Sequence, residues 1–204
     1  MKGNAEEYKE YDSPFFAMMS RMKYINRWAL MRNSYSENIS EHSLEVGMIA
    51  HVLALISNKK YGNHLNAERA ALLGMYHDCT EIITGDMPTP IKYYNTETKE
   101  AYKNVEKQAA KELLEMLPDY LCEEYEKILF PQEQEEYLWK LVKAADRLSA
   151  YIKCIEEEKA GNREFSNAKA TIFARLAEMD LQEVRDFLRD FEPSYKKTLD
   201  ELKK

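Results

Sequence analysis

The sequence predicts an all-α protein, a compact array of several helices in one domain. Three observations lead to this prediction. The 204 residues include only six glycines and six prolines, about half of average usage, which disfavours a turn-rich β architecture. Apolar residues recur at helical spacing along most of the chain, and the alternation typical of strands is nearly absent. The length suits a single domain with its own core.

The composition excludes several classes of protein. A content of 45% hydrophobic and 32% charged residues is neither disordered nor fibrous. The net charge of −7 argues against the broad basic surface that nucleic acid requires. The apolar stretches are too short to span a membrane. Residues 1–12, expected to be flexible, lack the apolar region of a secretory signal. Three scattered cysteines indicate free thiols in a reducing cytoplasm: Cys79, Cys122 and Cys154.

The domain is expected to cover residues 13–204, and its first helix to begin at Pro14. An apolar stripe follows from Phe15 to Ile25, so this helix should end near residues 26–28. A loop without periodicity comes next, over about residues 31–39.

The second helix is expected to start where Asn38 and Glu41 have the spacing of a capping box, and to run to about Asn58. Asn66 can cap a third helix, which should extend to about Ile83. Residues 85–90 cannot continue that helix because they include two prolines and a glycine. Further helices are expected over about residues 97–117, from there to Phe130, from Pro131 past Ile155 to near Gly161, and over about 166–177, 180–190 and 193–203.

Two of the four histidines are predicted to face the core. At about 100° per residue, His42 falls on the same face as four apolar residues of its helix: Val46, Ile49, Leu53 and Ile56. His77 shares a stripe with Ala70 and Leu73, Asp78 follows it, and Glu81 comes one turn later near the same face. A single inward histidine is more often a hydrogen-bonded core residue. Two of them beside a carboxylate favour a metal site.

Asp146 lies at the edge of the inward stripe of a later helix. A carboxylate there is costly to bury unless it is paired or bound to a metal. A salt bridge within the bundle is the alternative explanation. Together, neutral imidazole and carboxylate suit a divalent ion.

The order His42, His77-Asp78, Asp146, with each set on its own predicted helix, resembles the H…HD…D signature of the HD-domain metal-dependent phosphohydrolases. The flanking residues are similar to those of the bacterial HD-domain 5′-deoxynucleotidases, which remove phosphate from deoxyribonucleoside 5′-monophosphates. This likeness covers about residues 14–195 and depends on five segments: Arg27 to Arg32, Glu41-His42-Ser43, Met75 to Glu81, Thr84 to Pro90, and Lys143 to Asp146.

The resemblance implies an HD-domain fold, a divalent metal such as cobalt or manganese, and a homodimer. The cysteines indicate the cytoplasm, and the net charge and short apolar stretches predict no nucleic-acid or membrane partner. The implied metal ligands are His42, His77, Asp78 and Asp146. Of these, His42, Asp78 and Asp146 would also contact the substrate.

The remaining roles follow from the same resemblance and from side-chain chemistry. Glu81 is expected to act as general acid or base, and Arg27 to clamp the phosphate and assist catalysis, because guanidinium matches phosphate oxygens. Trp28 would pack on the sugar or base and disfavour a ribose 2′-hydroxyl. Asp86 would accept a hydrogen bond from the 3′-hydroxyl. The pocket wall would be formed by Met87, Pro88 and Thr89.

Two alternatives remain open at this point. The same site could serve a triphosphohydrolase that acts on deoxynucleoside triphosphates, although no cluster of lysines and arginines surrounds the motifs. In a different class, the metal could merely hold together a non-catalytic helical interaction module. Glu81 and Arg27 argue against that reading, since a structural metal site needs neither.

Overall fold

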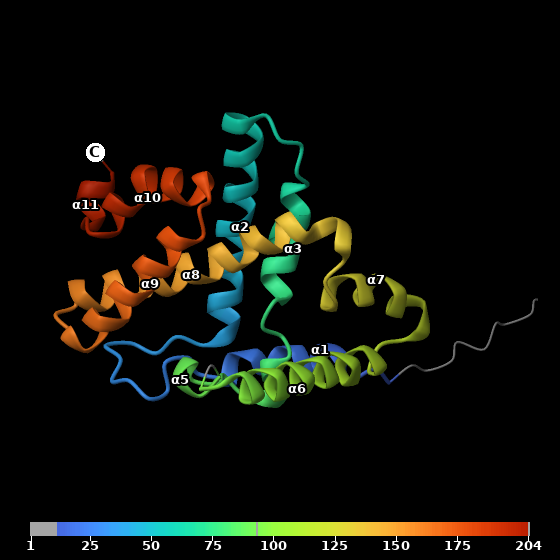
Figure 1. Ribbon diagram of the computed structural model, residues 1–204. Helices are drawn as coiled ribbons and strands as arrows, with labels where there is room; N and C mark the ends of the chain where they lie inside the picture. The colour runs from blue at the N-terminus through green and yellow to red at the C-terminus, as the bar shows by residue number, and fades with distance from the viewer. Residues whose placement is uncertain (1–11, 93, 204) are drawn as a thin grey trace, which may run out of the picture.

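The computed structural model describes residues 12–92 and 94–203, and this part of the chain is helical, with one isolated β-bridge. The predicted all-α class is therefore confirmed (Figure 1). Of the expected flexible segment, residues 1–11 lie outside the described residues. The elements are α1 Phe15–Met19, η1 Ser20–Tyr24, α2 Ile39–Tyr61, α3 Ala67–Tyr76, α4 Glu81–Thr84, α5 Thr89–Lys92, α6 Thr96–Glu115, α7 Asp119–Leu129, η2 Glu133–Glu135, α8 Glu136–Lys159, η3 Arg163–Phe165, α9 Ser166–Glu178, α10 Gln182–Tyr195 and α11 Leu199–Leu202.

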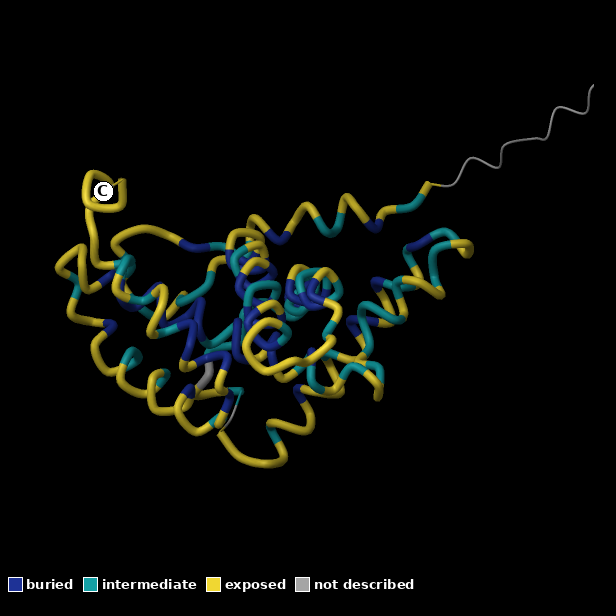
Figure 2. The backbone as a smooth tube through the Cα atoms, turned by 90° about the horizontal axis from the view of Figure 1, so that it is seen from above, coloured by how far each residue is buried: buried dark blue, intermediate teal, exposed yellow. Residues whose placement is uncertain are grey.

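Helices α2, α3 and α8 form the centre of the molecule, and α8 crosses α2 near its middle (Figure 1). Their apolar faces, joined by residues of α9 and α10, make the larger of two hydrophobic cores. Figure 2 shows the buried backbone concentrated in this region. The central helix α2 is apolar enough to meet length and composition criteria for a membrane span, yet 56% of that window is buried inside the protein. We therefore interpret α2 as a core helix of the folded domain.

Two glycines let α2 and α3 approach closely. A Cβ atom added to Gly74 would lie 2.8 Å from the Cα of Gly47, which is closer than real side chains tolerate. The two backbones are therefore in direct contact at this crossing. The contact fixes the distance between the start of α2 and the end of α3, where His42 and His77 lie.

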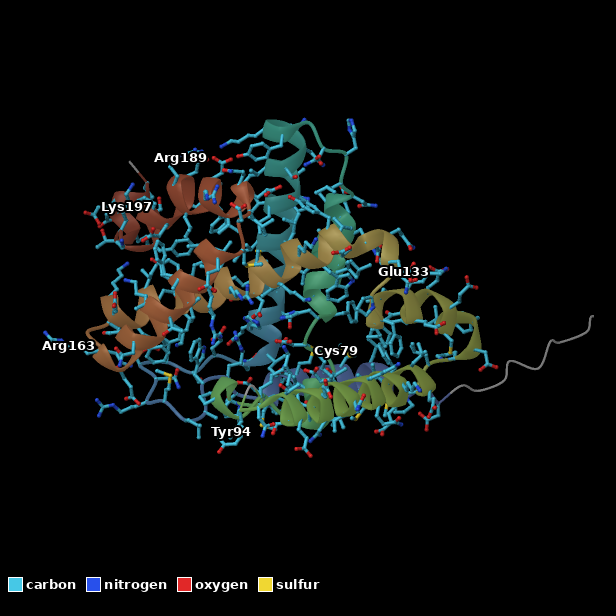
Figure 3. The ribbon with its side chains drawn as sticks, viewed as in Figure 1. Cys79, Tyr94, Glu133, Arg163, Arg189 and Lys197 are labelled. Carbon is cyan, nitrogen blue, oxygen red and sulfur yellow. The ribbon has the colours of Figure 1, made fainter. Side chains whose placement is uncertain are left out.

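A second, smaller core packs α1 and η1 against α6 and α7. Its buried members include Phe15 from α1, Leu113 from α6, and Ile39 at the first position of α2. Cys79 belongs to the same core, and Figure 3 shows it in the turn at the lower end of α3. The functional site lies where the two cores meet, because α2 and the end of α3 contribute to both.

The helix starts predicted from capping residues are confirmed. Asn38 accepts a hydrogen bond from the Glu41 amide, and the Glu41 side chain bonds back to Asn38, which completes the capping box. Asn66 caps α3 in the same way through the Arg69 amide. Gly161 follows α8 with a positive φ of 85°, as expected of a residue that ends a helix.

Two of the predicted helix ends near the site are wrong. The first helix tightens into the 3₁₀ segment η1 and ends at Tyr24, because Ile25 already has extended backbone. The third helix ends at Tyr76 rather than at Ile83. The carbonyl of Gly74, which would accept from the residue 78 amide in a continuing helix, faces Nδ1 of His77 instead. Residues 77–80 form tight turns, and α4 is a separate short helix.

Helix boundaries elsewhere in the chain also differ from the predicted ones. Residues 85–90 interrupt the preceding helix as expected, but a short helix, α5, begins within them at Thr89. Pro131 does not open the long helix. It keeps Phe130 extended, and η2 intervenes before α8. Near the end of the chain, α10 continues through Pro193, because only its last turn follows the proline and few hydrogen bonds are lost.

Candidate metal and phosphate site

Four of the predicted site residues meet where α2, the end of α3 and the middle of α8 converge. Nε2 of His42 lies 3.2 Å from Oδ1 of Asp146 and 3.6 Å from Oδ2 of Asp78. Nε2 of His77 lies 3.0 Å from the same Asp78 oxygen. Ligand atoms of His42, His77 and Asp146 all lie within 4.8 Å of one another. The four residues thus face a single point.

The contacts of the Nδ1 atoms indicate where each imidazole holds its proton. Nδ1 of His77 lies 2.8 Å from the carbonyl oxygen of Gly74, which can only accept, so this Nδ1 is protonated. Nδ1 of His42 lies 3.0 Å from Oγ of Ser149, and that hydroxyl donates its own proton to Glu45. Oγ of Ser149 must therefore accept from His42. With Nδ1 donating in each ring, Nε2 is the nitrogen that would present its lone pair to a metal ion, because histidine binds metals as the neutral imidazole.

The two bare Nε2 atoms face carboxylate oxygens, and this arrangement fits a cation. Both atoms are buried and make no hydrogen bond with any residue that the structure describes. Nitrogen and carboxylate lone pairs repel each other when nothing lies between them. A divalent ion would remove this repulsion, and imidazole nitrogen with carboxylate oxygen is a donor set that such ions favour. Nδ1 contacts of this kind are those that orient metal-binding histidines in proteins.

The two aspartates are ionised in this environment. Burial raises the pKa of Asp78, but the neighbouring His77, His42 and Arg27 outweigh it and hold the pKa below its usual value. Burial likewise raises the pKa of Asp146, but His42 and His77 together outweigh it and hold the pKa below its usual value. Two negative charges are therefore available at the point where the histidine lone pairs meet.

Glu81 differs from these two aspartates. It lies at the start of α4, is 5% exposed, and its Oε2 has no hydrogen-bond partner within the described chain. Burial first, and then the charges of Asp78 and Asp86, raise the pKa of Glu81 to about 10. Glu81 therefore carries a proton at neutral pH, and its free oxygen can donate that proton to a molecule in the site.

Arg27 and Trp28 reach the site from the loop that joins η1 to α2, called here the recognition loop (residues 26–38). Nη2 of Arg27 lies 4.0 Å from Oδ1 of Asp146. The carboxylate of Glu37 holds both side chains: it accepts from Nη1 of Arg27 at 3.1 Å and from Nε1 of Trp28 at 2.8 Å. The indole also packs on the ring of Phe165, with the ring centroids 5.2 Å apart.

The loop between α4 and α5 contains the remaining predicted residues. Asp86 is half-buried there, and its carboxylate accepts a hydrogen bond from the backbone of Trp28, which links the two loops. Met87 and Pro88 follow it and are half-buried. The side chain of Thr89 lies outside the described residues. The substrate contacts of these residues remain predictions.

Both ends of the recognition loop are closed by backbone hydrogen bonds. Residues 26 and 38 form the isolated β-bridge. The Arg27 amide donates to the Glu37 carbonyl at 2.9 Å, and the Ile39 amide donates to the Ile25 carbonyl at 3.0 Å. The loop thus begins and ends at the first turn of α2, beside His42.

A buried ion pair on α8 holds the outer part of the recognition loop. Lys153 and Glu157 are 3% and 0% exposed and bond to each other. Nζ of Lys153 also donates to the carbonyl of Tyr35 at 2.8 Å, and Glu157 accepts from the Ser34 amide at 2.8 Å. The helix that supplies Asp146 therefore also fixes the loop that supplies Arg27 and Trp28.

Three residues that contact the site were not identified from the sequence. Ser149 is a polar residue on an apolar stripe, one turn after Asp146, and this was an available signal. Glu45 lies one turn after His42, beside the same stripe. Glu37 lies in a loop without periodicity, and no pattern in the sequence marks it.

Most of the chain is similar to a family of enzymes. The model of the 5′-deoxynucleotidase YfbR-like family matches residues 14–195. The chain is 50% identical over 191 residues to a 5′-deoxynucleotidase of Vibrio vulnificus, with 94% of this chain and 98% of the relative covered. It is 52% identical over 190 residues to a 5′-deoxynucleotidase of Photorhabdus temperata, with 93% and 96% covered.

Solved structures share the fold. An HD-domain phosphohydrolase from Listeria innocua has a TM-score of 0.77 at 23% identity, with 89% of this chain and 87% of that chain covered. The HD phosphohydrolase of cyanophage S-2L, determined with dA and one catalytic Zn²⁺ ion, has a TM-score of 0.62 at 24% identity, with 89% and 96% covered. These likenesses confirm the predicted HD-domain architecture.

Proposed function

This chain belongs to the YfbR-like family of 5′-deoxynucleotidases, and on that premise we propose that its histidine–aspartate site hydrolyses deoxyribonucleoside 5′-monophosphates to deoxynucleoside and phosphate. The observation that supports the proposal most is the pair of bare, buried Nε2 atoms of His42 and His77, which face two ionised carboxylates beside a buried arginine. Such a site suits a divalent cation together with a phosphate group.

His42, His77, Asp78 and Asp146 would hold the ion. When bound, it supplies positive charge to the phosphoryl oxygens and makes water a better nucleophile. Cobalt or manganese fits the mixed nitrogen and oxygen donors, and metal availability selects between such ions as much as ligand type does.

Arg27 binds the phosphate in this proposal. Its side chain is 12% exposed, and the charge of Glu37 helps to keep its pKa above the usual value, against the effect of burial. Nη1 is engaged with Glu37, which leaves Nη2, near Asp146, free to donate to a phosphoryl oxygen. The two N–H groups of Nη2 lie in the plane of the guanidinium and point in fixed directions, so they orient a phosphate oxygen better than the freely rotating ammonium of a lysine would.

Glu81 supplies a proton to the leaving group. The 5′-oxygen of the deoxynucleoside leaves as an alkoxide unless it is protonated, and such proton transfer contributes about 10²–10⁴-fold to rates. Burial and the charges of Asp78 and Asp86 raise the pKa of Glu81 and so favour the protonated form that this step requires. The carboxylate that remains can then accept a proton from water, which restores the resting state.

Trp28 and Asp86 recognise the sugar. The indole, fixed by Glu37 and Phe165, leaves no room for a ribose 2′-hydroxyl, and the half-buried carboxylate of Asp86 accepts from the 3′-hydroxyl. Met87, Pro88 and Thr89 complete the wall beside the sugar. The chain is also proposed to act as a homodimer in the cytoplasm. Light scattering after gel filtration would test the oligomeric state.

The decisive experiment measures phosphate release by chelator-treated protein with cobalt or manganese restored, on dAMP, AMP and dATP in parallel. We expect metal-dependent phosphate from dAMP, weak release from AMP and none from dATP. Tripolyphosphate released from dATP, with dAMP inert, would overturn the substrate assignment in favour of a triphosphohydrolase. Metal binding without turnover of any of the three nucleotides would favour a site that only stabilises the bundle.

A further inference from the structure

We propose that Glu37 is a positioning residue. Its carboxylate holds the side chains of Arg27, which is proposed to bind the phosphate, and Trp28, which is proposed to contact the sugar, in fixed positions relative to the metal ligand His42. The inference rests on the proposed function of the site, since it concerns how that function is organised. Neither the sequence motifs nor the family likeness identifies this residue.

The two oxygens of Glu37 have different partners. Oε1 accepts from Nη1 of Arg27 at 3.1 Å, and Oε2 accepts from Nε1 of Trp28 at 2.8 Å. The residue is 8% exposed, so water competes little for either bond. A carboxylate can accept both hydrogen bonds at once because both of its oxygens are acceptors. An amide of the same shape has one oxygen, so its NH₂ group would face one of the two donors.

The same carboxylate also reaches one of the proposed metal ligands, His42. Oε1 of Glu37 lies 3.5 Å from Nδ1 of His42, the nitrogen whose proton also faces Ser149. One side chain therefore touches a proposed metal ligand, the phosphate clamp and the sugar contact. The backbone of Glu37 reinforces this arrangement, because its carbonyl accepts the Arg27 amide.

Trp28 needs such support because its backbone is strained. Its φ is +58°, a conformation that is uncommon for residues other than glycine and costly for a bulky side chain. This backbone turns the indole inward toward Glu37 and Phe165 instead of outward to solvent. The hydrogen bond to Glu37 offsets the strain and fixes the orientation of the indole ring.

The first test observes the hydrogen bond itself in metal-free protein. With ¹⁵N-labelled tryptophan, the two indole N–H signals, from Trp28 and Trp139, are assigned with the W139F variant. In Glu37→Gln, the Trp28 indole proton should move upfield and exchange faster with solvent, because a charged acceptor is replaced by a neutral one or by a donor. The Trp139 signal should stay in place.

The second test measures kinetics with manganese restored. In Glu37→Gln, kcat/KM on dAMP should fall about 10- to 100-fold, the effect of losing one hydrogen bond to a charged group. Most of the loss should appear in KM, and the ratio of kcat/KM for dAMP over AMP should also fall. Metal content should match that of the unmodified protein.

Glu164→Gln is the matched control. Glu164 is exposed and accepts from the Arg32 amide of the same loop at 3.2 Å, and it touches neither Arg27 nor Trp28 in the contacts described. Its indole signals and its dAMP preference should stay unchanged. Glu37→Asp keeps the charge and both oxygens, so it should give smaller shifts in both readouts, and it serves as the test if Glu37→Gln does not fold.

An unmoved Trp28 signal together with an unchanged dAMP-to-AMP ratio in Glu37→Gln would overturn the proposal, even if thermal stability falls. Should the unmodified protein hydrolyse no deoxynucleotide, the proposed function fails, but the metal-free indole shift still decides whether Glu37 positions Trp28. The two failures are therefore distinguishable.

Discussion

The site has two halves that are held in place by different forces. The metal-binding half consists of His42 on α2, Asp146 on α8 and the His77–Asp78 turn directly after α3, and these three helices pack into the larger hydrophobic core. The recognition loop has no regular structure, and buried hydrogen bonds and one ion pair hold it. Packing places a helix without regard to the polar groups at its ends, whereas the loop depends on individual polar contacts. Substitutions should therefore affect the two halves differently.

The largest expected effect is loss of a metal ligand, which would test the first half. His77→Ala should reduce metal binding and bring turnover to background, because one of two imidazole donors is lost. The fold should persist, since the helix packing is untouched. Metal content by elemental analysis and phosphate release from dAMP would check this. His64→Ala, at an exposed turn, is the control and should retain both.

Glu81→Gln should separate chemistry from metal binding. We expect turnover to fall about 10²–10⁴-fold through loss of the proton donor, with metal content intact. A helical module that uses its metal only for stability would show no turnover to lose. Retention of more than a tenth of the activity would contradict the general-acid role.

Glu81 should also make the stability of the metal-free protein depend on pH. The folded protein holds a proton at Glu81 up to about pH 10, and the unfolded chain releases it above about 4.5. Unfolding in that window therefore releases a proton, and stability falls as pH rises, by at most about 1.4 kcal/mol per pH unit. Urea midpoints at pH 5, 7 and 9 should fall more steeply in the unmodified protein than in Glu81→Gln.

Helical periodicity predicted part of the first half. It put His42 and His77 on inward faces and Asp146 at the edge of an inward stripe, and the resemblance then grouped them with Asp78 as metal ligands. The break after Tyr76 was missed because it depends on a contact between His77 and the Gly74 carbonyl, which no propensity reports.

The recognition loop could be predicted only in part. Arg27 and Trp28 were identified by resemblance, while Glu37 was not identified at all. Its role depends on hydrogen bonds to residues brought close by the bridge between residues 26 and 38. A loop of this kind has no repeat, and its buried charges look like surface charges until their partners are known.

Breaking the ion pair on α8 would test the second half. Lys153→Met should destabilise the protein by about 3–5 kcal/mol, because it leaves the buried carboxylate of Glu157 without its cation. The outer part of the recognition loop should loosen, and KM for dAMP should rise. Lys140→Met removes an exposed pair with Glu136 on the same helix and should cost less than about 1 kcal/mol. Similar urea midpoints for both variants would contradict the argument.

The smallest expected effect concerns the residue at which the halves join. Asn38 ends the recognition loop and caps the helix that positions His42. Asn38→Ala should cost about 1 kcal/mol, or about 2–4 °C in Tm for a protein of this size. Asn66→Ala removes the equivalent cap of α3 and should cost the same. Only Asn38→Ala should also raise KM for dAMP, because fraying there displaces Glu37 and His42 together. If both variants leave KM unchanged, the two halves are mechanically independent, and the first turn of α2 does not couple them.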